Sequence, residues 1–279
     1  MTATPHLTAD DVVKALALPE RARVDQRVPK KMLAEHGAPT ATDRLLLTDG
    51  IEELQWIAAL KPGTVAIPEH RADGREYLEV AVLGVQVRAT HGKASQWLRL
   101  AELVHRAVPY PVLLIQALVP SAAATPDDGP PSPPAQLALS LAHKRAAQNE
   151  AGKTVLDGEV VRFELLGPDI GTASVAGRLL EALALDRQPH QDLMTMYQGW
   201  MDCLTAAEAG RITGRFRLTA DPAAAARQRE ALRTCQRLEQ EAERLRSQAA
   251  KERQISKQVD LNLALQRLKA DLNAARAQL

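Results

Sequence analysis

The chain has 279 residues, of which 46% are apolar, and this is enough for one substantial core. Its net charge of +1 indicates no particular partner, and an aromatic content of only 3% argues against a stacking platform for single-stranded nucleic acid. No apolar run reaches the roughly 20 residues that span a bilayer, and nothing near Met1 resembles a signal peptide. Since neither cysteine belongs to a CxxC pair, we expect a reduced, cytoplasmic protein without a membrane segment.

The first fifty residues predict three short helices. Thr8 and Asp11 have the spacing of a capping box, Pro29 suits the first turn of a second helix, and Thr40 with Asp43 begins a third. Five basic residues lie close together in this region: Arg21, Arg23, Arg27, Lys30 and Lys31. The first interpretation of this cluster is a solvated helix face, and contact with nucleic-acid phosphates is the alternative.

A series of strands follows. The extended pattern that starts at Ile51 turns at Lys61-Pro62-Gly63 into a second predicted strand over Thr64–Pro68. Asp73-Gly74 then predicts a hairpin into a long strand, Glu76–Arg88. We expect these three strands to form an antiparallel meander.

The run Ala107–Leu118 is the longest apolar stretch, and it predicts a central strand buried on both faces. The amphipathic helix expected over 93–107 carries Trp97, Leu100 and Val104 on one stripe and would cover that strand.

Beyond the central strand, the six prolines between 119 and 134 predict a surface loop. A strand from Leu137 to Arg145 and a second hairpin at Asp157-Gly158 leading into Glu159–Leu166 complete the predicted sheet. The fold class is therefore α/β (α+β), with a mixed, mostly antiparallel sheet and flanking helices. We expect this globular domain over 1–167, a helical segment over 168–220 and a long arm over 221–279.

The arm is predicted to be helical and to have coiled-coil periodicity. Asp221-Pro222 is a strong helix start, and no glycine or proline interrupts the chain from Ala223 to Leu279. One continuous helix of this length would extend about 80 Å. Two apolar registers do not join smoothly across the polar stretch Lys251–Asp260, which indicates either a stutter or a helical hairpin.

Two kinds of contact are predicted for the arm. The 12 basic and 7 acidic residues between Ala223 and Leu279 suit self-association or docking on an acidic partner, and direct nucleic-acid contact is the alternative. The candidates for a partner or oligomer interface are Leu238, Leu245, Leu261, Leu265, Leu268 and Leu272. The candidates for nucleic-acid contact are Lys251, Arg253 and Lys257, together with the five basic residues near the N-terminus.

No motif predicts a reaction. The seven histidines include no HExxH motif, and the chain has no phosphate-binding loop and no GxSxG motif, so we expect neither a metal site nor a cofactor. Asp73, Glu79 and Lys144 could form the acidic and lysine set of a metal-dependent nuclease. A turn explains Asp73, the polar edge of a strand explains Glu79, and a strand end explains Lys144. This nuclease is therefore an alternative to a non-enzymatic protein.

Four stretches of the sequence resemble the bacterial family known as domain of unknown function 4391. They are Val28-Pro29-Lys30-Lys31, Ile51-Glu52-Glu53-Leu54 through Leu60 to Val65, Val108-Pro109-Tyr110-Pro111, and Val259-Asp260-Leu261-Asn262 through Leu268-Lys269-Ala270. The resemblance implies a gene neighbourhood of helicases and DNA methyltransferases in phage-defence or restriction-like clusters. It implies no catalytic residues.

We therefore expect a non-enzymatic accessory or adaptor subunit of such a defence system, which binds a helicase or a DNA methyltransferase and engages DNA with it. Self-association through the C-terminal coiled coil is part of this expectation. A divergent metal-dependent nuclease and a direct DNA-binding protein are the alternatives.

Overall fold

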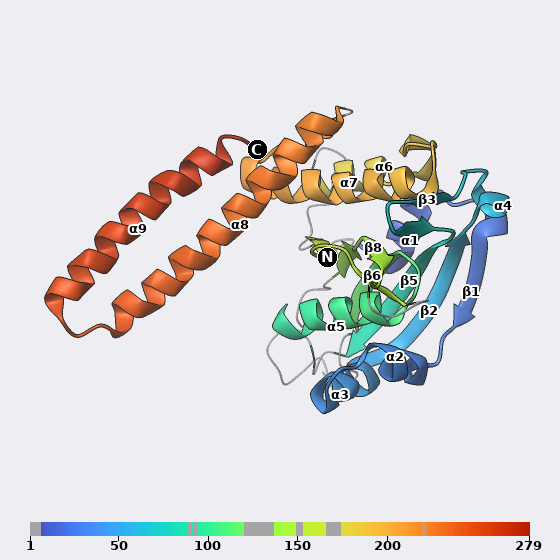
Figure 1. Cartoon of the computed structure of the whole chain (residues 1–279), viewed down its shortest axis with the longest axis horizontal. Coiled ribbons are helices and arrows are strands. Elements are labelled where there is room, and N and C mark those ends of the chain that lie inside the picture. Colours follow the sequence, from blue (N-terminus) through green and yellow to red (C-terminus); the bar gives the residue numbers. More distant parts are fainter. Residues whose placement is uncertain are drawn as a thin grey trace, which may run out of the picture. The chain divides into compact units, whose positions relative to one another are not determined.

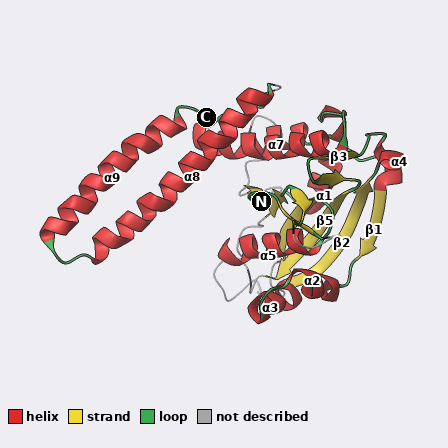
Figure 2. Cartoon of the chain, in the orientation of Figure 1, coloured by secondary structure: helices red, strands yellow, loops and turns green. Residues whose placement is uncertain are grey.

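The computed structural model describes residues 7–88, 91, 94–119, 137–148, 153–165, 174–219 and 221–279. The chain divides into two compact units, Met1–Leu204 and Thr205–Leu279. The first unit is a mixed α/β structure and the second is helical (Figures 1 and 2). Within the described residues, no helix is both long and apolar enough to cross a bilayer.

The first unit is built on a six-stranded sheet with the order β1-β2-β5-β6-β7-β10. The strands are β1 (Arg23–Arg27), β2 (Ile51–Leu60), β5 (Val80–Arg88), β6 (Val112–Val119), β7 (Leu137–Leu141) and β10 (Val161–Leu165). Only β5 and β6 are parallel, and the other neighbours are antiparallel. Helix α5 (Ala94–Ala107) connects β5 to β6, which supplies the long crossover that a parallel pair requires. The predicted mixed, mostly antiparallel sheet is confirmed.

Strand β6 is the interior strand that the apolar run predicted. Val112, Leu113, Leu114 and Ile115 are all fully buried, which is the pattern of a strand covered on both faces. The hydroxyl of Tyr197 donates a hydrogen bond of 2.7 Å to the carbonyl oxygen of Val112 at the start of the strand.

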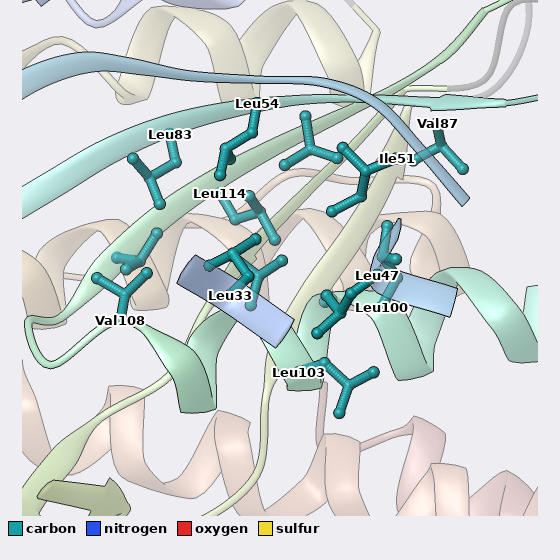
Figure 3. Packing of buried hydrophobic residues seen from close by; sticks show 14 of the residues in the cluster. Leu33, Leu47, Ile51, Leu54, Leu83, Val87, Leu100, Leu103, Val108 and Leu114 are labelled. Carbon is teal, nitrogen blue, oxygen red and sulfur yellow. The ribbon is translucent and has the colours of Figure 1, made fainter. Parts of the chain in front are cut away.

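Helices cover both faces of this sheet. Helices α2 (Lys30–Gly37), α3 (Ala41–Gly50) and α5 lie on one side, and α1 (Ala9–Ala15) and α6 (Val175–Ala182) lie on the other (Figure 1). The main core cluster packs α2, α3 and α5 onto β2, β5 and β6 (Figure 3). The predicted stripe of α5, with Trp97, Leu100 and Val104, is buried in this cluster.

Local capping accounts for where the first helices begin. The Thr8 and Asp11 capping box forms at the start of α1, as predicted. The Thr40 side chain accepts a hydrogen bond from the N–H of Asp43 at the start of α3. The carboxylate of Asp43 also binds the guanidinium of Arg99, with an Nε–Oδ1 distance of 2.7 Å and an Nη2–Oδ2 distance of 2.8 Å. The Thr40 hydroxyl therefore caps α3, and the Asp43 carboxylate holds α5 against it.

The predicted strand over Thr64–Pro68 is wrong. Residues Pro62–Val65 form a short helix, α4, with Pro62 in its first turn. The Thr64 hydroxyl accepts a hydrogen bond of 2.9 Å from the N–H of Lys61, and Ala66 ends the helix in the left-handed conformation with φ of 59°. The capping contacts at both ends therefore outweigh the β-branched residues of this stretch.

The predicted meander is also wrong. The Asp73-Gly74 hairpin forms, with φ values of 53° and 73°, but it joins β3 (His70–Ala72) to β4 (Arg75–Tyr77) in a separate two-stranded sheet. The expected long strand Glu76–Arg88 breaks before Val80, where the Glu79 carboxylate pairs with Lys61 at 2.9 Å. Strand β5 therefore pairs directly with β2.

A similar correction applies near Asp157-Gly158, which does not turn a hairpin. Strands β8 (Lys144–Ala146) and β9 (Thr154–Leu156) pair with each other, and β10 pairs with β7. The N–H of Asp157 donates a hydrogen bond to the carbonyl of His143, and its carboxylate binds Arg75 at 2.7 Å, so these contacts end the small sheet. Strand β1 was not predicted, and residues 120–134 of the expected proline-rich loop lie outside the described residues.

The helical segment after the sheet forms as predicted. It contains α6, a 3₁₀ turn (Leu185–Arg187) and α7 (Leu193–Thr213), which continues from the first unit into the second. Tyr197 and Trp200 are fully buried, which confirms that they belong to the core. The indole N–H of Trp200 donates to the carbonyl of Leu183 at 2.9 Å. Burial raises the pKa of the Cys203 thiol to about 12, so this cysteine is an inert core residue.

Candidate interaction site in the helical hairpin

The second unit contains a helical hairpin made of α8 (Pro222–Lys251) and α9 (Ile255–Arg276). The Asp221 carboxylate caps α8 by accepting hydrogen bonds from the N–H groups of Ala223 at 3.0 Å and Ala224 at 3.2 Å. This confirms the predicted helix start, because an aspartate followed by proline satisfies the first free N–H groups of a helix.

The tail is a hairpin and not one long helix. Glu252 and Gln254 both have extended backbone conformations, which interrupts the helix after Lys251. The N–H of Gln254 donates to the Glu252 carboxylate at 2.8 Å, and this bond lowers the pKa of Glu252. Of the two sequence alternatives, the structure therefore selects the turn within the polar stretch.

Two apolar clusters hold the helices of the hairpin together. One contains Cys235, Leu238 and Leu272, and the other contains Ala242, Leu245 and Leu265. An ion pair of 2.8 Å between Arg276 and Glu239 bridges α9 to α8. The six leucines predicted as a partner interface all belong to these clusters or pack against them: Leu238, Leu245, Leu261, Leu265, Leu268 and Leu272. In the structure these leucines make the internal seam of the hairpin.

Helix α9 carries a second apolar stripe that the sequence analysis missed. Ile255, Val259 and Leu263 are 78%, 51% and 48% exposed. They follow one another at intervals of four residues, so they lie on one face of the helix, away from the seam leucines. We call these three residues the outer stripe. Its sequence signal was present, but the stronger leucine periodicity of the same helix concealed it.

Three of the predicted nucleic-acid contacts lie at the turn of the hairpin. Lys251, Arg253 and Lys257 are all exposed, and they flank Ile255 of the outer stripe. Lys257 also contributes to the lowered pKa of Glu252, which is the acidic residue of this turn. The turn is therefore a basic tip beside an exposed apolar residue.

The basic residues near the N-terminus are mostly used within the chain. Arg21 donates to the carbonyl of Thr64 at 2.6 Å, Arg23 pairs with Asp25 at 2.9 Å, and Lys31 lies 3.7 Å from Glu35. The Lys30 ammonium donates to the carbonyl oxygens of Thr48 and Ile51, at 2.9 and 2.7 Å. Lys30 therefore satisfies the end of α3. Arg27 is exposed on the edge strand β1.

The structure gives the three residues of the nuclease alternative separate roles. Asp73 occupies the turn between β3 and β4, Glu79 pairs with Lys61, and the Lys144 ammonium donates to the carbonyl oxygen of Val108. Lys144 is only 2% exposed, and burial lowers its pKa to about 8. Across the described ranges, no three histidine, cysteine or acidic side chains come together as metal ligands.

A network of aromatic and polar side chains joins β3 and β4 to α7. The Nδ1 of His70 lies 2.8 Å from Asp192 Oδ2, and the Nε2 of His143 lies 2.8 Å from Gln198 Oε1. The Tyr77 hydroxyl binds the Nδ1 of His143, and Tyr77 is fully buried, which raises its pKa. The network therefore acts as packing between these elements. His105 is also buried, 3.0 Å from the Ser140 hydroxyl, and burial lowers its pKa to about 3.

The fold and these surfaces define a mixed α/β protein that carries a helical hairpin with one open apolar face. The chain belongs to the family described as "Domain of unknown function (DUF4391)", whose model matches residues 16–272. No curated protein and no solved structure matches the chain.

Proposed function

We propose that this protein is a non-enzymatic accessory subunit, working in the bacterial cytoplasm, that docks on a helicase or a DNA methyltransferase through the hairpin. The family membership supports the general setting, because the resemblance implies gene neighbours of these two classes in phage-defence or restriction-like clusters. The docking surface is the outer stripe of α9.

The observation that carries the proposal is that α9 has apolar residues on two faces and uses only one of them in the hairpin. Leu265 and Leu272, on the seam, are 8% and 9% exposed, whereas Ile255 on the outer stripe is 78% exposed. A run of exposed apolar residues along one helix face is typical of a helix that packs on another surface. The basic tip would favour an acidic surface on the partner, because opposite charges steer association.

The test is co-purification of the full-length protein with its neighbouring gene products. Val259→Glu and Leu263→Glu place charges on the outer stripe, and Leu98→Glu is the matched control, since Leu98 and Leu263 are both 48% exposed. We expect both stripe variants to lose the captured helicase or methyltransferase, while the control retains it. Equal capture by all three variants would overturn docking through this face.

The mass of the purified protein separates self-association from partner binding, because two hairpins could also meet through the outer stripe. If the stripe binds only a partner, the protein alone is monomeric and the variants do not change its mass. A dimer that Leu263→Glu converts into a monomer, with partner capture unchanged, would assign the stripe to self-association.

The basic tip favours direct DNA contact as a second candidate function. The triple variant Lys251→Gln, Arg253→Gln, Lys257→Gln removes three exposed charges from the tip. If the tip contacts phosphates, the slope of log affinity against log salt falls by roughly 3. Lys269→Gln, at an exposed residue of α9 outside the tip, leaves the slope unchanged. An identical slope for the triple variant and the wild type would exclude this contact.

A further inference from the structure

The first unit contains a cavity of about 410 Å³ that has no place in the proposed function. Its apolar lining comes from α2, β2, β5 and the segment after α5, and includes Met32, Leu33, Leu54, Trp56 and Leu83. We call it the α2–α5 cavity. Its volume lies in the range of roughly 300–1,000 Å³ that is typical of small-molecule sites.

The floor of the cavity is one end of the main core. Leu33, Leu54 and Leu83 are 4%, 1% and 2% exposed, and they lie near one another in the cluster (Figure 3). Because these side chains are held by close packing, the cavity is part of the folded structure and does not need a ligand to form.

One wall of the cavity is an aromatic pair. The rings of Trp56 and Tyr110 lie 6.3 Å apart at an angle of 57°. The indole N–H of Trp56 donates to the carbonyl of Ala58 at 2.9 Å, so the indole is held in place and its N–H is already used. The indole therefore contributes apolar surface to a ligand and no hydrogen bond.

Hydrogen bonds hold the segment that carries Tyr110. The Lys144 ammonium binds the carbonyl oxygen of Val108, and the Thr154 hydroxyl donates to the carbonyl oxygen of Pro109 at 3.1 Å. Val108, Pro109 and Thr154 all line the cavity. A wall supported in this way loses little conformational entropy when a ligand binds.

The charged side chains that line the cavity are both basic. Among the lining residues that the structure describes, the charged ones are Arg106 and Lys153, and none is acidic. Arg106 also pairs with Glu102 at 2.5 Å, and its side chain is 47% exposed, so it keeps N–H groups that can face a ligand. Cationic groups beside an apolar cavity complement an anion with an apolar body.

Three of the four stretches that carry the family resemblance meet at this cavity. Val28 comes from the first, Leu54 from the second, and Val108, Pro109 and Tyr110 from the third. Each stretch belongs to a separate structural element, and the structure brings the three together in one cavity wall.

We infer that the α2–α5 cavity binds a small organic anion, with its apolar body on Trp56, Tyr110 and the leucine floor and its acidic group beside Arg106 and Lys153. This site is separate from the hairpin and does not depend on the proposed docking function.

The test uses two fluorescent probes that share one apolar body. The first, 1-anilinonaphthalene-8-sulfonate, carries a negative charge, and the second, N-phenyl-1-naphthylamine, is uncharged. We expect the full-length protein to bind one sulfonate probe per chain, more tightly than the neutral probe. Arg106→Gln and Lys153→Gln should weaken binding of the sulfonate several-fold and leave the neutral probe unchanged. Octanoate or 1-naphthoate should displace the sulfonate probe.

Variants at Met32 locate the bound probe. Met32 lines the cavity and is 52% exposed, so a charged side chain is tolerated there. Met32→Glu should weaken sulfonate binding at least tenfold, whereas Met32→Lys should keep it. The matched control is Leu45→Glu, at a residue that is 60% exposed and does not line the cavity. Unfolding curves that match the wild type would show that the variants are folded.

Three results would overturn the inference. The first is sulfonate binding that Met32→Glu and Leu45→Glu affect equally, because the probe would then lie elsewhere. The second is equal binding of both probes with no effect of Arg106→Gln and Lys153→Gln, because the cations would then play no part. The third is displacement by a captured partner protein and not by small carboxylates, which would make the cavity a protein contact.

Discussion

The buried ammonium group of Lys144 donates a hydrogen bond to the carbonyl oxygen of Val108, and so ties β8 to the segment after α5. Lys144 is 2% exposed, whereas Val108 both belongs to the main core and lines the α2–α5 cavity. Lys144, a candidate nuclease residue by sequence, therefore supports the wall of the α2–α5 cavity.

The pH dependence of stability should reveal this buried lysine. Burial lowers the pKa of Lys144 from its usual 10.5 to about 8, so the unfolded chain binds the proton more tightly. Its contribution to the free energy of unfolding therefore rises as pH increases from 8 to 10.5, by up to about 3 kcal/mol. Below pH 8 the cost of burying the charge is fully present.

Chemical denaturation of the wild type and Lys144→Met across pH 7–10.5 tests this prediction. The wild type should gain stability relative to the variant as pH rises through that range. Lys31→Met is the matched control, because the Lys31 side chain is 86% exposed, and it should follow the wild type. Parallel curves for Lys144→Met and the wild type would contradict the prediction.

The ion pair between Asp43 and Arg99 should govern part of the acid sensitivity. The hydrogen bonds from Arg99 lower the pKa of Asp43 to about 2, from a usual value of 3.8. The ion pair therefore contributes fully to the free energy of unfolding above pH 4, and this contribution is lost as pH falls toward 2. Asp43→Asn should be less stable than the wild type at pH 7, and the difference should close below pH 4. Urea denaturation at several pH values measures it.

Arg99→Gln provides the second arm of that experiment. Removing the guanidinium takes away the main cause of the lowered pKa, so this variant should lose the same acid-dependent stability as Asp43→Asn. An Arg99→Gln protein that keeps the full acid dependence of the wild type would show that the ion pair is not its source.

Substitutions in the seam of the hairpin should lower its stability more than substitutions in the outer stripe. Leu272 is 9% exposed and packs against Cys235 and Leu238, so Leu272→Ala should destabilise the hairpin by about 2 kcal/mol or more. Leu263 is 48% exposed, and Leu263→Ala should change stability by less than about 0.5 kcal/mol. Hydrogen exchange of the α8 and α9 amides measures both. Equal protection in the two variants would contradict the observed seam.

Gly37 should be essential for the packing of α2 on α5. A Cβ atom at this position would lie 2.6 Å from the Cβ of Ala107 and 2.8 Å from the carbonyl oxygen of Leu103. Since a backbone atom cannot move aside easily, Gly37→Ala should cost about 1–3 kcal/mol. Gly63→Ala is the control, because a Cβ there meets nothing within 4 Å. Equal midpoints of thermal unfolding in the two variants would refute the close approach of Gly37 to α5.

Local patterns predicted much of the fold. The capping pairs Thr8 with Asp11 and Thr40 with Asp43 marked the starts of α1 and α3, and Asp221 marked the start of α8. These signals succeed because the groups that make them lie within four residues of one another. The apolar run of β6 was equally clear, since burial on both faces leaves Gln116 as the one polar residue of this strand.

Local patterns failed where the outcome depends on distant partners. Glu76–Arg88 was predicted as one strand, but it breaks before Val80, where Glu79 pairs with Lys61. The seam leucines of α9 were recognised as a periodic set, but the sequence did not show that their partners lie on α8. The outer stripe could be recognised only after the structure had shown which face of α9 the seam occupies.

The sequence by itself determined the starts of α1, α3 and α8, the central strand, the polar break in the tail and the class of the fold, because each depends on spacing within a few residues. Only the tertiary structure decided that the tail folds back on itself and that Val28, Trp56 and Tyr110 line one cavity. These three residues lie in separate elements and are joined by strand pairing and helix packing. Their proximity depends on the packing of the whole core, so no local pattern of residues could predict it.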